Sequence, residues 1–150
     1  MKTDQLPRTC GSCTLCCKVY GVAELHKPAD TWCPSVQIGV GCAIYADRPY
    51  SCRTFRCAWL KGLVPEALRP DQIHGVATLE ADGHLEIHED PAYPGVARAA
   101  LEAVIEAAMQ DNQSYAAVVT GPSSVLLASP DRLAQLQRDH PQLIECVLLH

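Results

Sequence analysis

The N-terminal part of this chain is built around the sequence Cys10-Gly-Ser-Cys13-Thr-Leu-Cys16-Cys17. Four further cysteines follow before residue 60, at Cys33, Cys42, Cys52 and Cys57. Eight of the nine cysteines in the chain therefore lie between residues 10 and 57. A reduced domain without a ligand has little use for so many thiols, so the segment predicts either a thiolate metal site or a disulfide-bonded knot.

Three features of the sequence favour metal over disulfides. Cys-x2-Cys spacing presents two sulfurs to one ion, whereas cysteines three residues apart on one helical turn do not close a disulfide easily. An odd total of nine would leave one unpaired thiol in an oxidising compartment. The first residues, 1–7, are polar and hold no apolar run of the kind found in signal peptides. We therefore expect a cytoplasmic protein, because clustered cysteines in a reducing compartment bind metal more often than they pair.

The two cysteine blocks are also similar to those of a known family. The second block reads Cys42-Ala-Ile-Tyr45-Ala-Asp-Arg48-Pro49-Tyr-Ser-Cys52-Arg53-Thr-Phe55. Together with the first block it resembles the bacterial cysteine-cluster proteins with the CxxCxxCC motif, which are described as zinc- or iron-chelating. The resemblance covers residues 10 to 57 and implies chelation of a metal or an Fe–S cluster by these cysteines. It implies no particular reaction and says nothing about residues 60 to 150.

We predict that the clustered thiolates are the metal ligands. The predicted set is Cys10, Cys13, Cys16, Cys17, Cys33, Cys42, Cys52 and Cys57. Cys10, Cys13 and Cys16 recur every third residue and fall along one face of a helical or turn-like segment, so Cys17 should point elsewhere. This geometry indicates either two centres of four thiolates each, or one centre with a spare thiol beside it.

An iron–sulfur cluster is slightly favoured over zinc, on the softness of the ligands more than on their spacing. Cys-x2-Cys-x2-Cys is the start of the bacterial ferredoxin motif, and Cys33-Pro34 supplies the remote Cys-Pro of such clusters. The fourth in-line cysteine of that motif is missing, however. Zinc stays the alternative, because it needs only four thiolates and tolerates many spacings.

Charge is distributed unevenly along the chain. The net charge of −5 combines +4 over residues 1–62, from eight Lys/Arg and four Asp/Glu, with −9 over residues 63–150, from four Lys/Arg and thirteen Asp/Glu. Arg48, Arg53 and Arg56 lie among the last ligand candidates, where they would offset thiolate charge. The acidic chain lacks a basic stripe with interleaved aromatics, so we expect no nucleic-acid partner. It also lacks an apolar run long enough to span a membrane, so we expect no membrane partner. An unknown protein partner is the one class of partner that the sequence leaves open.

A β-hairpin is predicted after the cysteine-rich part. Residues 73–80 and 84–88 alternate as two strands joined by a turn-forming sequence. A three-residue loop with Gly83 in the left-handed conformation would pair Leu79 with Leu85.

Two groups of polar residues could be taken for a second functional site. His84, Glu86 and His88 should share one outer face of their strand, while Glu102 and Glu106 lie four residues apart on a helix. We interpret both groups as solvated faces, because the thiolates offer a better metal site.

The remaining periodicity predicts further helices and strands. Their ranges are a helix from Pro94 to Gln110, strands at 114–120 and 125–128, a helix capped by Ser129, and a final helical turn containing a buried Cys146. The sequence therefore predicts an α+β fold. Residues 1–62 should form a cysteine-rich, metal-stapled lobe of short helices and loops, and residues 63–150 a small antiparallel sheet packed by two or three helices, the two forming one unit.

Two classes of function are consistent with this pattern. In the first, the metal is structural or carries electrons, and the protein is a metal-binding or metal-handling module. In the second, the centre is redox-active or catalytic and modifies or matures another protein. The sequence shows no Ser-His-Asp or Cys-His pairing and no dinucleotide motif, so the first class is preferred and enzyme activity is left open.

Overall fold

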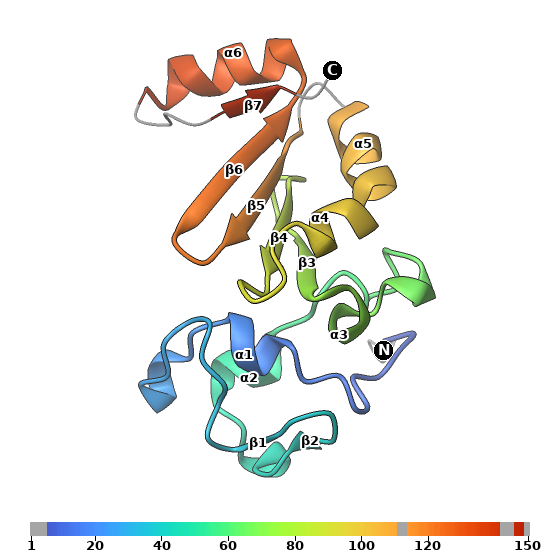
Figure 1. The fold of residues 1–150 in the computed structure, drawn as a ribbon, viewed down its shortest axis with the longest axis vertical. Helices are drawn as coiled ribbons and strands as arrows, with labels where there is room; N and C mark the ends of the chain where they lie inside the picture. Colours follow the sequence, from blue (N-terminus) through green and yellow to red (C-terminus); the bar gives the residue numbers. More distant parts are fainter. Residues whose placement is uncertain (1–5, 111–113, 142–145, 149–150) are drawn as a thin grey trace, which may run out of the picture.

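The computed structural model describes residues 6–110, 114–141 and 146–148, and its fold is α+β, as predicted. Figure 1 shows the cysteine-bearing N-terminal segment at one end of the molecule and a larger sheet with its helices above it. The regular elements of the N-terminal segment are short: α1 (Cys16–Val19), β1 (Val36–Gln37), β2 (Gly41–Cys42) and α2 (Tyr50–Thr54). Loops and single 3-10 turns connect them.

Five strands form the larger sheet, in the order β3-β4-β5-β6-β7. Their bounds are β3 Gly75–Leu79, β4 Leu85–Glu89, β5 Ala116–Thr120, β6 Ser123–Ala128 and β7 Cys146–Leu148. The prediction of an antiparallel sheet is wrong, because β4–β5 and β6–β7 are parallel pairs while β3–β4 and β5–β6 are antiparallel. The connections after β4 and after β6 each carry helices and are long enough to return the chain to the same end of the sheet.

The hairpin of β3 and β4 has the predicted register. Leu79 pairs with Leu85 and Ala77 with Ile87. Gly83 has a φ of 90°, a left-handed conformation that favours glycine, and its N–H donates to the carbonyl of Glu80 at 2.9 Å. The hydrophobic alternation and the turn residue therefore fixed this register locally.

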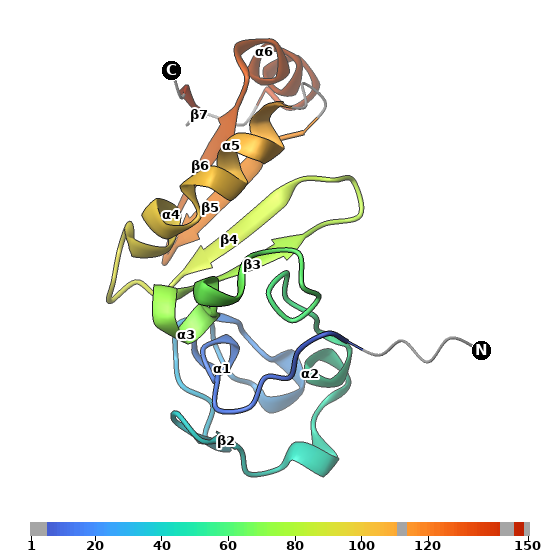
Figure 2. The same ribbon diagram turned by 90° about the vertical axis from the view of Figure 1, so that its right-hand side faces the viewer.

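The helical region after β4 is divided into two pieces. α4 (Val96–Ala100) begins later than predicted, because Gly95 at φ 83° turns the chain just before it, and α5 (Glu102–Gln110) continues beyond a break at Leu101. The predicted apolar stripe is confirmed by the burial of Ala97, Leu101 and Ile105. Figure 2 shows both helices running along one face of the sheet, where α4 packs on β3 and β4 and α5 packs on β5 and β6.

The C-terminal helix begins where the sequence predicts. The Ser129 hydroxyl accepts a hydrogen bond from the N–H of Arg132 at 3.2 Å and caps α6 (Pro130–Asp139), whose Leu133 and Leu136 are buried. No helix within the described ranges is long and apolar enough to cross a membrane.

The prediction of a final helical turn is wrong for the described residues of this segment. Residues Cys146–Leu148 form β7, which adds to β6 in parallel. Pairing satisfies backbone groups along β6 that a helical turn would leave exposed. Leu143 and Ile144 lie outside the described residues, as does the side chain of Cys146, whose burial stays a prediction.

One hydrophobic cluster joins the cysteine lobe (residues 6–62) to the sheet. It runs from Leu15 and Val19 in the first block to Ile87 in β4 and Leu101 beside α4. Two polar contacts reinforce the junction: the N–H of Ala58 donates to the carbonyl of Ala77 at 2.7 Å, and the Lys18 ammonium contacts both carboxylate oxygens of Asp90 at 2.8 Å. The predicted boundary near residue 62 thus falls inside a continuous core.

Candidate metal centre

Seven of the eight clustered cysteines line one cavity of about 630 Å³ in the cysteine lobe. They are Cys10, Cys13, Cys16, Cys17, Cys33, Cys42 and Cys52. The eighth, Cys57, is buried at 8% exposure, and its sulfur accepts a hydrogen bond from the N–H of Leu60 at 3.4 Å. All eight thiols are free of disulfide bonds. The fold therefore gathers the predicted ligands from four separate segments into one region.

The first three thiols come from a turn that leads into α1. The N–H of Cys13 donates to the carbonyl of Cys10 at 2.8 Å, and Gly11 inside this turn has a φ of 52°. The helix then begins at Cys16, so the thiols follow one another at the spacing of a helical turn. Burial raises the pKa of Cys13 to about 11, so its thiol keeps its proton until a ligand displaces it.

The neighbouring thiols of Cys16 and Cys17 interact with each other. A hydrogen bond between them raises the pKa of Cys16, with burial adding to the effect, and lowers that of Cys17 to about 7. The two thiols therefore influence each other's pKa, and the prediction that their side chains serve different centres stays a prediction. Consecutive side chains on one turn diverge at Cβ, but rotation about χ1 still lets their sulfur atoms meet.

Three loops bring the later cysteines to Cys17. The N–H of Cys33 donates to the carbonyl of Cys17 at 2.9 Å, Cys42 lies in β2 opposite Val36, and Cys52 lies in α2. Burial raises the pKa of Cys52, and the charges of Cys17, Cys33 and Cys42 raise it further, which indicates that these sulfurs are near neighbours. The loop before Cys42 also approaches the first block, since the N–H of Gly39 donates to the hydroxyl of Thr14 at 3.2 Å.

The effects of the sulfurs on one another's pKa link the first cysteine block to the later cysteines through the Cys16–Cys17 pair, so the two groups named below follow the prediction of two centres. Burial raises the pKa of Cys10 most, and the charge of Cys57 is the next largest cause. The pKa of Cys16 is raised by Cys17 and by burial, and further by the charges of Cys10 and Cys13. We call Cys10, Cys13, Cys16 and Cys57 the first thiol group, and Cys17, Cys33, Cys42 and Cys52 the second thiol group. Within the described residues, no three Cys, His, Asp or Glu side chains are placed to hold one metal ion as they stand. The donor chemistry thus fits a soft metal, but ligation requires the thiol side chains to close further around it.

Positive charge lies close to the thiols, partly as predicted. Arg48 lines the cavity and lowers the pKa values of Cys10 and Cys17, and Arg56 lowers that of Cys10. Arg53 is exposed and acts on neither pKa. Lys27 was not predicted to take part in the site, but it is 5% exposed and lowers the pKa of Cys17.

Lys27 has a structural role as well as an electrostatic one. Its ammonium group donates to the carbonyl oxygens of Lys18 at 3.0 Å, Pro28 at 3.1 Å and Tyr20. These bonds close the C-terminal end of α1, where unpaired carbonyls favour a cation. Lysine is usually a surface residue, and nothing in the sequence around Lys27 indicates otherwise. Its burial therefore became visible only in the tertiary structure.

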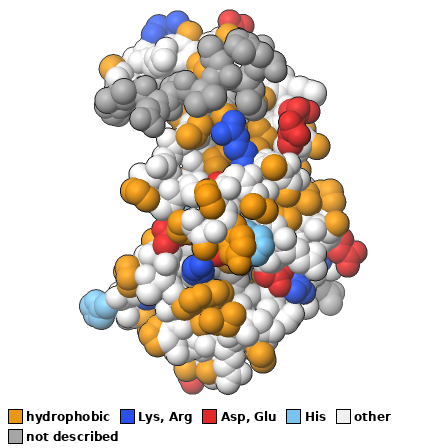
Figure 3. Space-filling view, in the orientation of Figure 1, with side chains coloured by type: hydrophobic (Ala, Val, Ile, Leu, Met, Phe, Trp, Pro, Cys, Tyr) orange, Lys and Arg blue, Asp and Glu red, His pale blue; other side chains and the backbone are white. Residues whose placement is uncertain are grey.

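The aromatic side chains differ in their packing. Trp59 is buried and its indole N–H donates to the carbonyl of Glu66 at 3.0 Å, as ordinary packing predicts. Tyr45, by contrast, is 64% exposed at the cavity wall, where the Arg48 guanidinium lies over its ring, so it is not a core residue. Figure 3 shows hydrophobic side chains gathered on one face of this lobe.

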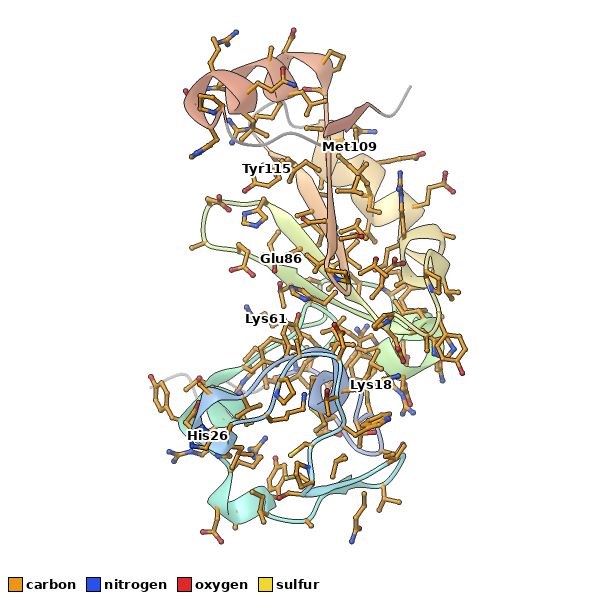
Figure 4. The ribbon with its side chains drawn as sticks, turned by 60° about the vertical axis from the view of Figure 1, so that its left-hand side comes forward. Lys18, His26, Lys61, Glu86, Met109 and Tyr115 are labelled. Carbon is orange, nitrogen blue, oxygen red and sulfur yellow. The ribbon has the colours of Figure 1, made fainter. Side chains whose placement is uncertain are left out.

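The histidine row on β4 is less exposed than predicted. His88 packs against Tyr20 with ring centroids 4.6 Å apart and the rings tilted by 43°, while His84 stacks on Tyr115 at 4.5 Å. Both histidines contact the carboxylate of Glu86, which is labelled in Figure 4. This face is therefore half-buried and internally paired, and it leaves the thiols as the candidate metal centre.

Comparison of the chain with family models, with curated proteins and with solved structures finds no match. The resemblance to CxxCxxCC proteins accordingly stays a prediction resting on the two motif blocks. What the fold and the site define is an α+β protein with a thiol-lined cavity at one end.

Proposed function

We propose that this chain is a cysteine-ligated metal-binding protein whose centre is structural, handles metal or carries electrons. The observation that carries the proposal is the convergence of seven unpaired thiols on one cavity, with the buried Cys57 near enough to raise the pKa of Cys10. Thiolates are soft ligands that select zinc, Cu(I) and iron–sulfur clusters over hard cations. The two thiol groups supply four sulfurs each, the number that a structural zinc or an iron–sulfur cluster requires.

An iron–sulfur cluster is preferred over zinc in this proposal. The softness of the thiolates and the ferredoxin-like spacing of Cys10, Cys13 and Cys16 are the grounds for this preference. Arg48, Arg56 and Lys27 would offset part of the negative charge of a thiolate-bound centre. We infer a reducing, cytoplasmic location for the same reason as before, since free clustered thiols persist there.

Anaerobic purification followed by elemental analysis and assay of acid-labile sulfide tests this proposal. We expect iron with sulfide, or zinc, at one or two centres per chain. Cys16→Ser should lower the metal content of the first thiol group, and Cys17→Ser should lower that of the second. Each substitution should remove about one centre per chain, because loss of one of four ligands weakens a structural site strongly. Cys146→Ser is the matched control, since β7 lies at the far end of the molecule from the cysteine lobe (Figure 1). A chain that binds neither metal after anaerobic reconstitution contradicts the proposal.

The contact between Cys16 and Cys17 supports one alternative, a redox-active centre that modifies or matures another protein. In that case Cys17 is a spare thiol beside a single centre. Cys17→Ser would then leave metal content unchanged, whereas Cys16→Ser would abolish it.

A further inference from the structure

The hydroxyl group of Tyr20 is buried and has no hydrogen-bond partner among the described residues. A phenol O–H taken out of water without a partner destabilises the chain that holds it, so each such group requires an explanation. The ring is held in place, because it packs against Phe55 with centroids 4.9 Å apart and against His88 at 4.6 Å. The hydroxyl therefore cannot readily turn to water.

The position of Tyr20 connects this hydroxyl with the candidate metal centre. Tyr20 lines the same cavity as the thiols and directly follows α1, where its N–H donates to the carbonyl of Cys16 at 3.3 Å. Burial, and then the charges of Glu86, Cys16 and Cys57, raise the pKa of Tyr20. The hydroxyl thus keeps its proton and is available as a donor.

Two kinds of acceptor lie near this donor, a carboxylate and the thiols. The carboxylate of Glu86 forms no hydrogen bond with the Tyr20 hydroxyl, and its two oxygens contact His88 at 2.5 Å and His84 at 3.5 Å. A neutral thiol is a weak acceptor, but a metal ligand must be a thiolate, which accepts a hydrogen bond much more strongly. Metal binding would therefore create the acceptor that the Tyr20 hydroxyl lacks.

We propose that the Tyr20 hydroxyl donates a hydrogen bond to a metal-bound thiolate of the first thiol group, with Cys16 as the acceptor. This inference rests on the proposed metal-binding function and assigns the residue that stabilises and tunes the bound centre. Hydrogen bonds to ligand sulfurs are a principal means by which proteins set metal affinity and reduction potential.

Titration of the reduced, metal-free full chain with Co²⁺ tests the inference, because cobalt–thiolate absorption reports both affinity and ligand environment. Tyr20→Phe should weaken Co²⁺ binding by about tenfold, the effect of losing one hydrogen bond to a charged acceptor, and should shift the absorption band. In urea unfolding, metal-free Tyr20→Phe should be at least as stable as the parent, since the variant removes an unpaired buried group. Tyr50→Phe, at a residue 71% exposed and outside the cavity lining, is the control and should leave both measurements unchanged.

The outcomes separate this inference from the function on which it rests. If the parent chain binds no Co²⁺, the proposed function fails and the inference fails with it. If the parent binds Co²⁺ and Tyr20→Phe binds it equally with the same absorption, the inference is wrong while the proposed function stands. Destabilisation of the metal-free variant would instead assign the hydroxyl a structural role in the unliganded fold and would also overturn the inference.

Discussion

Gly75 in β3 lies close against α4, and Gly75→Ala tests how the sheet and this helix are packed. A Cβ at this position would lie 2.3 Å from the Cβ of Ala97 in α4, far inside contact distance. Ala97 is fully buried, and its Cβ is fixed to the helix backbone, so the helix itself would have to move. Overpacking of this kind costs up to about 3 kcal/mol, and the gain from replacing a strand glycine returns about 0.7 kcal/mol. We expect a net destabilisation of about 2 kcal/mol.

The partner substitution provides a double-mutant cycle. Ala97→Gly alone should cost about 2 kcal/mol, from helix propensity and one lost buried methyl group. In the double variant the methyl group at position 75 takes the space left at position 97, so its stability should approach that of the parent. The interaction energy should therefore reach at least about 2 kcal/mol.

Urea unfolding followed by circular dichroism measures these free energies. Ala99→Gly, at an exposed position of α4, is the matched control and should be additive with Gly75→Ala. A neutral Gly75→Ala, or an additive Gly75→Ala and Ala97→Gly pair, would refute the described packing of α4 on β3.

Three further predictions concern the cysteine lobe and its junction with the sheet. Asp90→Asn should destabilise the chain by about 2 kcal/mol in urea unfolding, between the values for buried and exposed ion pairs, because Lys18 is 18% exposed while Asp90 is 4% exposed; an unchanged midpoint would contradict this. Arg48→Gln should weaken Co²⁺ binding about threefold at pH 7, since loss of its charge raises the pKa of nearby thiols, whereas Arg53→Gln should have no effect; equal affinities would argue against charge compensation. Metal affinity should fall as pH falls, by about tenfold per pH unit for each thiol proton displaced, because the pKa of Cys13 is about 11 and metal must compete with that proton; pH-independent binding between pH 6 and about 8 would exclude thiolate ligation.

Local patterns predicted the parts of the fold that depend on neighbouring residues. Gly83 and the alternation around it were enough for the β3–β4 register, and Ser129 for the start of α6. The parallel pairing of β4 with β5 was missed, because it joins strands separated by two helices and leaves no local signal.

The site shows the same division between local and tertiary information. The eight cysteines were found from their spacing, and seven of them line one cavity. The buried ammonium of Lys27 and the unpaired hydroxyl of Tyr20 were missed, because both depend on what the fold places around them. A position four residues after Cys16 was the one signal in the sequence that could have singled out Tyr20.

Native mass spectrometry of the anaerobically purified chain tests the central claim most directly, because one spectrum reports both bound metal and the oxidation state of the thiols. We predict a mass above that of the polypeptide by the metal or iron–sulfur content. After anaerobic removal of the metal with a chelator and no added reductant, the metal-free mass should retain every thiol hydrogen. A metal-free chain whose mass shows the hydrogen loss of paired disulfides among Cys10, Cys13, Cys16, Cys17 and the later cysteines would contradict the account.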